Sequence, residues 1–204
     1  MASGMNRWER RKQETRKKIV NIAMDLFRKQ GFGATSMEQI AMEVDIAKAT
    51  LYSYFNVKEA IINEYVEQSL RESEPEIDGL LQILPDTRSR LVAVAERAAA
   101  WIVSHKDILQ IYITYRLQNL QEAIKDRSKW SELENAFAKI IRAGQDFGDL
   151  RTDIRSEILA KYLDLLHGAA VMSWLLDQVN NPLLESLSKA YDLFLNGACT
   201  GPSK

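Results

Sequence analysis

The apolar residues of the first sixty positions recur with helical spacing, and this pattern constrains the fold more than any other feature of the sequence. Intervals of three and four residues predict a first helix over about Arg10–Lys29, which Gly31 can end because glycine tolerates a positive φ. A short helix ending at about Val44 is expected next, and then another over about Lys48–Phe55. The apolar residues that define the first helix are Ile19, Ile22, Ala23, Leu26 and Phe27.

Two residue pairs before the second helix fit a capping box, in which two side chains three residues apart cap the helix start reciprocally. Thr35 with Glu38 satisfies this pattern, and so does Ser36 with Gln39. The break at residues 45–47 then leaves two short helices joined by a tight turn. Three helices arranged in this way are typical of a helix-turn-helix.

The rest of the chain also has helical spacing, without the alternation typical of strands. A fourth helix is expected to be capped by Asn56 and to end near Glu74, while Pro75 and Pro85 bracket a weakly patterned stretch. We therefore expect an all-α protein of about nine helices. The further helices are a long one capped by Asp86 that reaches about Ser104, and others over about 107–120, 128–147, 155–179 and 183–196.

The composition is typical of a helical protein with a sizeable core. Hydrophobic residues make up 46% of the 204 positions, and only four prolines and nine glycines interrupt the helical pattern. The single cysteine, Cys199, excludes a disulfide framework. The basic start is not followed by an apolar stretch, and no run reaches the ~18 apolar residues of a membrane span. We expect a soluble, cytoplasmic protein without a membrane partner.

The net charge of −1 conceals an uneven distribution of charge. Residues 1–58 carry 11 Lys or Arg and 6 Asp or Glu, a net charge of +5, whereas the remainder carries 16 and 22, a net charge of −6. A basic first quarter favours an anionic partner for this part of the chain. A solvated basic helix surface would give the same counts, so charge alone leaves both interpretations open.

The third helix has one apolar side that is expected to pack on the first two helices. Its other side carries Ala49, Thr50 and Ser53, with Tyr52 and Tyr54 at the rim. Such a small polar face can lie in a major groove without a steric block, and tyrosine hydroxyls suit phosphate oxygens. An ordinary helical hairpin with surface tyrosines is the alternative. The apolar side consists of Ala47, Leu51 and Phe55.

Many residues of these helices stand at fixed spacing, namely Arg16-x-x-Ile19, Ala23-x-x-Leu26-Phe27, Gly31-Phe32, Thr35-Ser36-Met37-x-x-Ile40-Ala41 and Lys48-Ala49-Thr50-Leu51-Tyr52-Ser53-Tyr54-Phe55-x-x-Lys58-Glu59. Because of these motifs, about residues 12–65 resemble the N-terminal domain of tetracycline-repressor (TetR) family regulators. The resemblance implies a helix-turn-helix DNA-binding domain over residues 1–60. It also implies a larger helical-bundle domain for ligand binding and dimerisation over residues 61–204.

The resemblance implies a role in DNA binding for nine residues. Thr35 and Ser36 match positions that touch phosphate, and Lys58 matches a clamp on the DNA backbone. Lys58 also lies at the start of a helix, where its ammonium and the backbone amides can hold a phosphate together. Tyr52 and Tyr54 match backbone contacts, and Tyr52 sometimes reaches a base. The positions that approach base edges are Lys48, Ala49, Thr50 and Ser53.

Three positions depart from the family pattern. Asp45 stands where the turn usually has glycine, and aspartate tolerates the left-handed conformation better than most residues. Ala49 replaces a frequent glycine, and its methyl group can contact a thymine or restrict approach to the base. Ala47 replaces a frequent serine and so removes a possible cap and phosphate contact. We expect these changes to alter site preference and to leave DNA binding itself intact.

The resemblance also implies a homodimer and a small-molecule effector. The helices over about 155–179 and 183–196 would pair with their copies, so that two recognition helices reach half-sites about one turn apart. Packing within the monomer alone is the alternative. The helices over 86–147 would hold a pocket for a lipophilic effector, although each candidate residue also suits ordinary core. These candidates are Trp101, Ile108, Ile111, Tyr112, Tyr115, Phe137, Ile141, His167 and Trp174.

We therefore expect a repressor that binds a palindromic operator in double-stranded DNA and releases it when a small molecule binds. An activator, a ligand-independent DNA-binding protein and a helical lipid carrier are the alternatives. An enzyme is not expected, because the sequence has no nucleophile–base pairing and no phosphate-binding glycine loop. No cofactor or metal is expected either, since His105 and His167 are too few to form a metal site.

The cations that precede or open the first helix are expected to add non-specific affinity for DNA phosphates, which salt would weaken. A frayed and solvated tail is the alternative. These cations are Arg7, Arg10, Arg11, Lys12, Arg16, Lys17 and Lys18.

Overall fold

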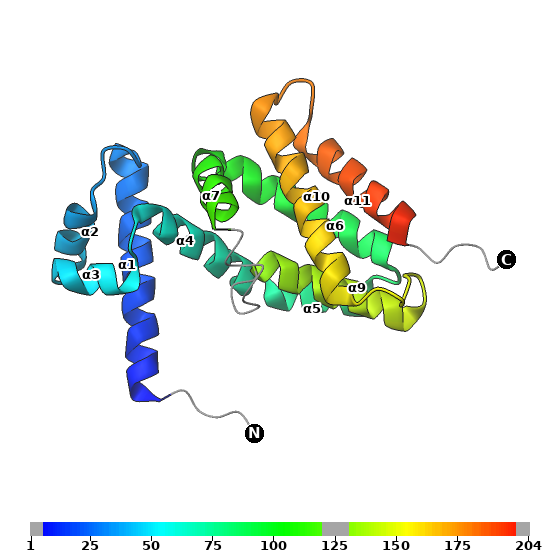
Figure 1. The fold of residues 1–204 in the computed structure, drawn as a ribbon, viewed down its shortest axis with the longest axis horizontal. Helices are drawn as coiled ribbons and strands as arrows, with labels where there is room; N and C mark the ends of the chain where they lie inside the picture. Colours follow the sequence, from blue (N-terminus) through cyan, green and yellow to red (C-terminus); the bar gives the residue numbers. More distant parts are fainter. Residues whose placement is uncertain (1–5, 120–130, 199–204) are drawn as a thin grey trace.

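The computed structural model describes residues 6–119 and 131–198, and these residues form ten α-helices and no strand. A smaller group of helices surrounds α1, and α4 leads from this group into a larger bundle that ends with α11 (Figure 1). The predicted all-α fold with an N-terminal helix-turn-helix is confirmed.

The N-terminal group consists of α1 (Arg7–Gln30), α2 (Met37–Val44) and α3 (Lys48–Tyr54), with α4 (Lys58–Glu72) packed against α1. Each helix turns one apolar stripe toward a shared core, and this burial holds α3 in place while its outer side faces solvent. The completely buried residues of this core are Ile19, Val20, Ala23, Ile40, Val44, Leu51, Ile61 and Ile62.

Local sequence explains the turn between α2 and α3. Ser36 is the N-cap of α2, and its hydroxyl accepts a hydrogen bond of 3.1 Å from the Gln39 amide. Asp45 ends α2 with φ 61° and ψ 52°, the left-handed conformation that the sequence predicted for it. Ala47 precedes α3 and supplies no side-chain cap, as expected for alanine.

The second group contains a helix that the sequence pattern did not reveal. This helix, α5 (Glu74–Ile83), occupies the stretch between Pro75 and Pro85. Pro75 lies in its first turn, where the missing N–H is not needed, and Ile77 and Leu80 are buried. The other helices are α6 (Thr87–Ser104), α7 (Lys106–Gln118), α9 (Glu132–Phe147), α10 (Ser156–Leu176) and α11 (Leu183–Ala198).

Several helix boundaries differ from those expected, and α1 for example begins at Arg7, three residues before the expected start. Val57 rather than Asn56 is the N-cap of α4, and its side chain makes no capping bond. Ser131 caps α9, whereas the expected start near residue 128 lies outside the described residues. Helix α10 ends at Leu176, three residues before the expected end.

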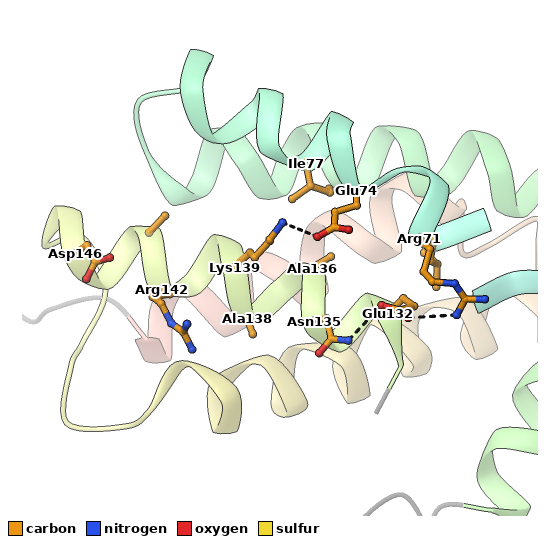
Figure 2. Close-up of a pocket in the computed structure, with 12 residues that line it drawn as sticks. Arg71, Glu74, Ile77, Glu132, Asn135, Ala136, Ala138, Lys139, Arg142 and Asp146 are labelled. Atoms are coloured by element: carbon orange, nitrogen blue, oxygen red, sulfur yellow. Dashed lines mark hydrogen bonds and ion pairs between the residues drawn. The ribbon is translucent and has the colours of Figure 1, made fainter. Parts of the chain in front are cut away.

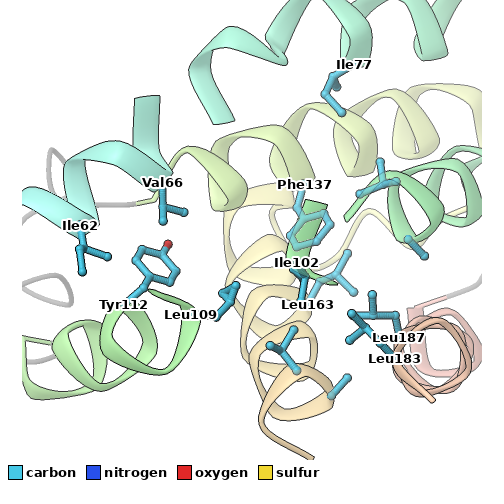
Figure 3. Packing of buried hydrophobic residues seen from close by; sticks show 14 of the residues in the cluster. Ile62, Val66, Ile77, Ile102, Leu109, Tyr112, Phe137, Leu163, Leu183 and Leu187 are labelled. Atoms are coloured by element: carbon cyan, nitrogen blue, oxygen red, sulfur yellow. The ribbon is translucent and has the colours of Figure 1, made fainter. Parts of the chain in front are cut away.

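The core of the second group centres on α10, which packs against both α9 and α11. Phe137, Leu163 and Leu187 come from these three helices and are completely buried. Figure 3 shows that this packing continues through Leu109 and Tyr112 of α7 toward α4. The core therefore connects α4, and through it α1, with the far end of the bundle. None of the described helices is both long and apolar enough to cross a membrane.

Candidate functional site

The outer side of α3 is the candidate DNA-contacting surface. Ala49, Thr50 and Ser53 are exposed, and 42% of the Tyr52 surface is exposed beside them. Tyr54 is half-buried and packs against the core of the domain. The predicted outward orientation of the small polar side is thus confirmed, and contact with DNA stays a prediction.

Lys48, at the start of α3, forms an ion pair with Glu38 in the first turn of α2. This hydrogen bond lowers the pKa of Glu38 and raises the pKa of Lys48. The Lys48 ammonium also lies 5.8 Å from the centroid of the Tyr52 ring. A DNA phosphate would therefore compete with the Glu38 carboxylate for Lys48.

Thr35 and Ser36 both precede α2, but only Ser36 is exposed. Thr35 is 1% exposed, and its hydroxyl donates to the Gly31 carbonyl (2.9 Å) and accepts from the Gln30 side chain (3.1 Å). The hydroxyl of Thr35 therefore holds the loop between α1 and α2, and the phosphate contact of Thr35 stays a prediction. The exposed Ser36 hydroxyl remains a candidate.

Lys58 lies at the start of α4, and its ammonium is directed at the loop between α1 and α2. Nζ donates to the carbonyls of Phe32 (2.7 Å) and Thr35 (3.0 Å) and lies 4.2 Å from the centroid of the Phe32 ring. An ammonium has three protons, so these carbonyls occupy two of them. Lys58 therefore braces the loop before α2, and a phosphate contact would use the remaining proton.

Arg16 holds the end of α3, a role that the sequence reasoning missed. Its guanidinium lies 4.4 Å from the centroid of the Phe55 ring, donates to the Tyr54 carbonyl (3.4 Å) and pairs with Glu64 of α4 (2.7 Å). The sequence signal was its position one turn before the buried Ile19. This placement directs the side chain of Arg16 toward the domain rather than toward solvent.

The nine candidate effector-binding residues lie in separate clusters in the described contacts. Trp101 stacks on His105, with ring centroids 4.2 Å apart, next to Tyr65 of α4. Phe137 of α9 instead packs against His167 of α10, with ring centroids 5.9 Å apart. Their role in effector binding stays a prediction. The buried candidates are Tyr112, Phe137, Ile141, His167 and Trp174, and the partly buried ones are Trp101, Ile108, Ile111 and Tyr115.

A largely buried polar network connects α4 with three helices of the second group. Arg116 of α7 lies 3.3 Å from Asp164 of α10 and 3.4 Å from the Tyr112 hydroxyl. Tyr112 donates to Glu67 of α4 (3.1 Å), whose second oxygen accepts from the Glu132 amide at the start of α9 (2.7 Å). Burial raises the pKa of both Glu67 and Asp164. The network thus ties α4 to the helices that surround the predicted effector region.

Two cavities lie elsewhere on the second group, and none of the nine candidates lines either of them. The first, of about 420 Å³, is an open groove between α4–α5 and α9 (Figure 2). Ion pairs cross it from Arg71 to Glu132 (3.3 Å) and from Lys139 to Glu74 (2.8 Å). The second, of about 330 Å³, lies between α6 and α11. In the described part of the chain, no His, Cys, Asp or Glu side chains are grouped to hold a metal ion.

Helix α10 carries an apolar stripe that faces solvent. Tyr162 and Leu165 are 54% and 52% exposed, and Ile158 and Leu176 extend the stripe along the helix. These positions are separated by three, four and eleven residues, which places them on one side of a helix. A row of exposed large apolar residues is typical of a surface that another protein covers.

Comparison with known proteins finds similarity to DNA-binding regulators. Residues 19–65 match the family model described as "Bacterial regulatory proteins, tetR family". The regulator UidR of Escherichia coli strain K12 is 25% identical over 169 residues, which are 80% of this chain and 84% of UidR. The repressor KstR2 of Rhodococcus jostii is 25% identical over 162 residues, covering 74% of this chain and 76% of KstR2.

Solved structures share the whole fold. The TetR family repressor FadR of Thermus thermophilus, in complex with lauroyl-CoA, superposes with a TM-score of 0.78 at 26% identity, over 92% of this chain and 97% of FadR. Bacillus subtilis FadR in complex with stearoyl-CoA superposes with a TM-score of 0.61 at 15% identity, over 89% and 98% of the two chains. The second likeness supports the fold alone.

Proposed function

We propose that this chain is a dimeric repressor of the TetR family, released from a palindromic operator by a small lipophilic molecule; the match of residues 19–65 to the family model supports this. The observation that supports DNA binding is the exposed side of α3. It carries Ala49, Thr50, Tyr52 and Ser53, and three of these four side chains are small. Its short side chains suit entry into the major groove, and the phenol and hydroxyl groups suit phosphates and base edges.

The proposed dimer forms through the exposed stripe of α10, joined by residues of α11. Leu184 and Leu193 of α11, the helix that packs against α10, also expose apolar surface. Burying such side chains against a second copy removes apolar surface from water, which favours association. A two-fold axis through this bundle would present two copies of α3 to the two half-sites of a palindrome.

For the effector we propose an acyl-CoA or a related lipophilic acyl compound. The lauroyl-CoA complex of the Thermus FadR, with its similar fold over nearly the full length of both chains, supports this class. The aromatic and aliphatic candidates between α6, α7, α9 and α10 suit an acyl chain. Binding there would require those helices to separate, since several of the candidates are now core residues.

Helix α4 would transmit effector binding to the DNA-binding domain. The polar network joins Glu67 of α4 to α7, α9 and α10. Two residues earlier in α4, the Tyr65 hydroxyl lies 3.1 Å from Nε2 of His105, and the guanidinium of Arg28 of α1 lies 5.9 Å from the centroid of the Tyr65 ring. An effector that separates the helices of the bundle would alter both contacts, and it regulates only if it prefers one position of α4.

The DNA-binding proposal can be tested with an operator selected from random duplexes. Fluorescence anisotropy would measure the affinity of the wild type, Tyr52→Ala and the control Leu117→Ala, whose side chain is exposed on α7. We expect Tyr52→Ala to weaken binding by about tenfold, a typical loss for a contact residue, without lowering Tm. Equal affinity of all three proteins for the selected duplex, or no selected duplex at all, would refute the proposal.

The effector proposal can be tested with lauroyl-CoA, laurate and coenzyme A as separate probes. We expect lauroyl-CoA to raise Tm, because a ligand of the folded state stabilises it, and to release the labelled operator at the same concentrations. Coenzyme A alone should do neither. A rise in Tm without release of the operator would show that the compound binds but does not regulate DNA binding. No effect of any probe would exclude this effector class.

A further inference from the structure

The seven cations at the start of α1 fall into two groups in the structure. Lys18 donates to the Val44 carbonyl at the end of α2 (2.8 Å), and Lys17 pairs with Glu72 of α4 (3.3 Å). Together with Arg16, these residues hold the domain together. The remaining four have exposed side chains, and in the described residues none forms a hydrogen bond or ion pair with another element. They are Arg7, Arg10, Arg11 and Lys12.

The segment that carries these four cations is an ordered helix that projects from the domain. Asn6 caps it through a capping box with Glu9, so the first turn is stabilised without any tertiary contact. The first buried residue of α1 is Ile19, and Trp8 is 67% exposed. Figure 1 shows the start of α1 extending past α3 with no other helix along it.

We propose that residues 7–14 form an arm that binds the sugar–phosphate backbone of the DNA duplex beside the half-site contacted by α3. The inference rests on the proposed DNA-binding function and adds a second, sequence-independent contact to it. Because α1 is continuous from the arm into the core of the domain, and Arg16 holds the end of α3, the arm is fixed relative to the recognition helix. Such a fixed arm loses little conformational entropy when it binds.

The chemistry of the arm favours DNA over a membrane surface. Four cations against two carboxylates suit a polyanion, and Glu9 is already occupied as part of the cap. An amphipathic helix that adsorbs to lipid needs a broad apolar face, whereas Trp8 is the only large apolar residue of the segment. The Lys12 ammonium lies 5.2 Å from the centroid of the Trp8 ring, so the indole packs against a cation and does not form part of an apolar face.

The test compares how operator affinity depends on salt in three full-length proteins. The arm variant is Arg7→Gln/Arg10→Gln/Arg11→Gln/Lys12→Gln, in which glutamine keeps the helix propensity. The control removes four exposed cations of the second group, as Arg88→Gln/Arg97→Gln/Lys106→Gln/Lys189→Gln. A third protein, Arg7→Lys/Arg10→Lys/Arg11→Lys, keeps the charge of the arm.

We expect the arm variant to bind the selected operator about tenfold or more weakly at 0.1 M salt, with unchanged Tm. Removal of each phosphate interaction should reduce the slope of log affinity against log salt by about 0.9, so the slope for a dimer should fall by about 2 or more. The control and the lysine variant should keep the wild-type slope. Hydroxyl-radical footprinting should show reduced protection of the backbone next to the half-site.

The outcomes separate this inference from the function on which it rests. If the wild type selects an operator and the arm variant binds it with the wild-type slope, the arm makes no DNA contact and only this inference fails. An equal loss in the control would assign the effect to net charge and also overturn it. If the wild type shows no sequence-specific binding, the proposed function itself fails. Loss of adsorption to anionic phosphatidylserine vesicles, with unchanged DNA binding, would assign the arm to a membrane instead.

Discussion

At the scale of single residues, the ion pair between Glu38 and Lys48 limits how strongly α3 can attract a phosphate. We expect Glu38→Gln to tighten operator binding by about two- to fivefold at 0.1 M salt, because it frees the Lys48 ammonium and removes a negative charge beside DNA. Anisotropy titrations with the selected operator would measure this change.

The matched control for this prediction is Glu43→Gln, which neutralises an exposed carboxylate at the other end of α2. It should change the affinity less than Glu38→Gln does. Equal gains in the two variants would show that general charge, and not release of Lys48, is responsible.

A second residue-scale feature is the buried imidazole of His167. Its Nδ1 lies 2.7 Å from the Tyr191 hydroxyl, and burial, aided by the charge of Arg116, lowers its pKa from 6.5 to about 4. The unfolded chain therefore binds more protons between these values. The contribution of His167 to stability is full above about pH 6.5 and is lost as the pH falls toward 4, by up to about 3 kcal/mol.

Asp164, one turn earlier on α10, and Glu134 of α9 have the opposite effect on the pH dependence of stability. Burial raises the pKa of Asp164 and Glu134, so their contribution disfavours folding as the pH rises through the raised values. Comparison with His167→Gln removes their effect, because both proteins keep these groups. Urea unfolding at several pH values should show the wild type gaining stability relative to His167→Gln between pH 4 and 6.5. A difference that does not vary with pH would contradict the prediction.

At the scale of helices, Gly144 of α9 lies against Thr87 at the start of α6. The hydroxyl and amide of Thr87 donate to the two oxygens of Asp149 (2.9 and 2.8 Å), directly beside the glycine. A Cβ at Gly144 would overlap the Thr87 hydroxyl and lie 2.7 Å from Asp149 and 3.0 Å from Leu150. Gly144→Ala should therefore lower the free energy of unfolding by about 1–3 kcal/mol, measured in urea.

Gly79 of α5 is the matched control, because no heavy atom would lie within 4 Å of an added Cβ. Gly79→Ala should stabilise the protein by up to about 1 kcal/mol, since alanine favours the helix. Opposite signs for the two variants would support the close contact at Gly144. An equal gain in both would show that α6 and α9 can separate without loss.

At the scale of the whole molecule, the apolar stripe of α10 determines whether two DNA-binding domains act together. We expect Leu165→Lys to shift the protein from dimer to monomer, because it would bury an unpaired ammonium in the proposed interface. Sedimentation velocity would measure the assembly state, and binding to a full palindrome should weaken more than binding to one half-site.

The control is Val103→Lys, which adds the same charge at an exposed valine of α6 outside the stripe. It should leave the assembly state unchanged. If Leu165→Lys stays dimeric, or if Val103→Lys becomes monomeric, the α10 stripe is not the interface.

Local features of this chain followed from the sequence alone. The all-α class, the outward side of α3, the Ser36 cap and the left-handed Asp45 depend on interactions within a few residues, and helical spacing or capping chemistry encodes them. The sequence also showed the basic start of α1, but it did not show which of these cations pair with other helices. Helix α5 was missed, because its helical pattern is weak, one proline lies in its first turn and another follows its end.

Only the tertiary structure decided which polar groups are available for function. Thr35 is buried and Lys58 donates to a carbonyl 26 positions away, so both side chains also support the loop before α2, which the sequence did not indicate. Arg116 and Asp164 are 48 positions apart, and no local pattern pairs them. Packing of distant helices determines such burial and pairing, whereas the sequence determines the helices and the sides that they turn to solvent.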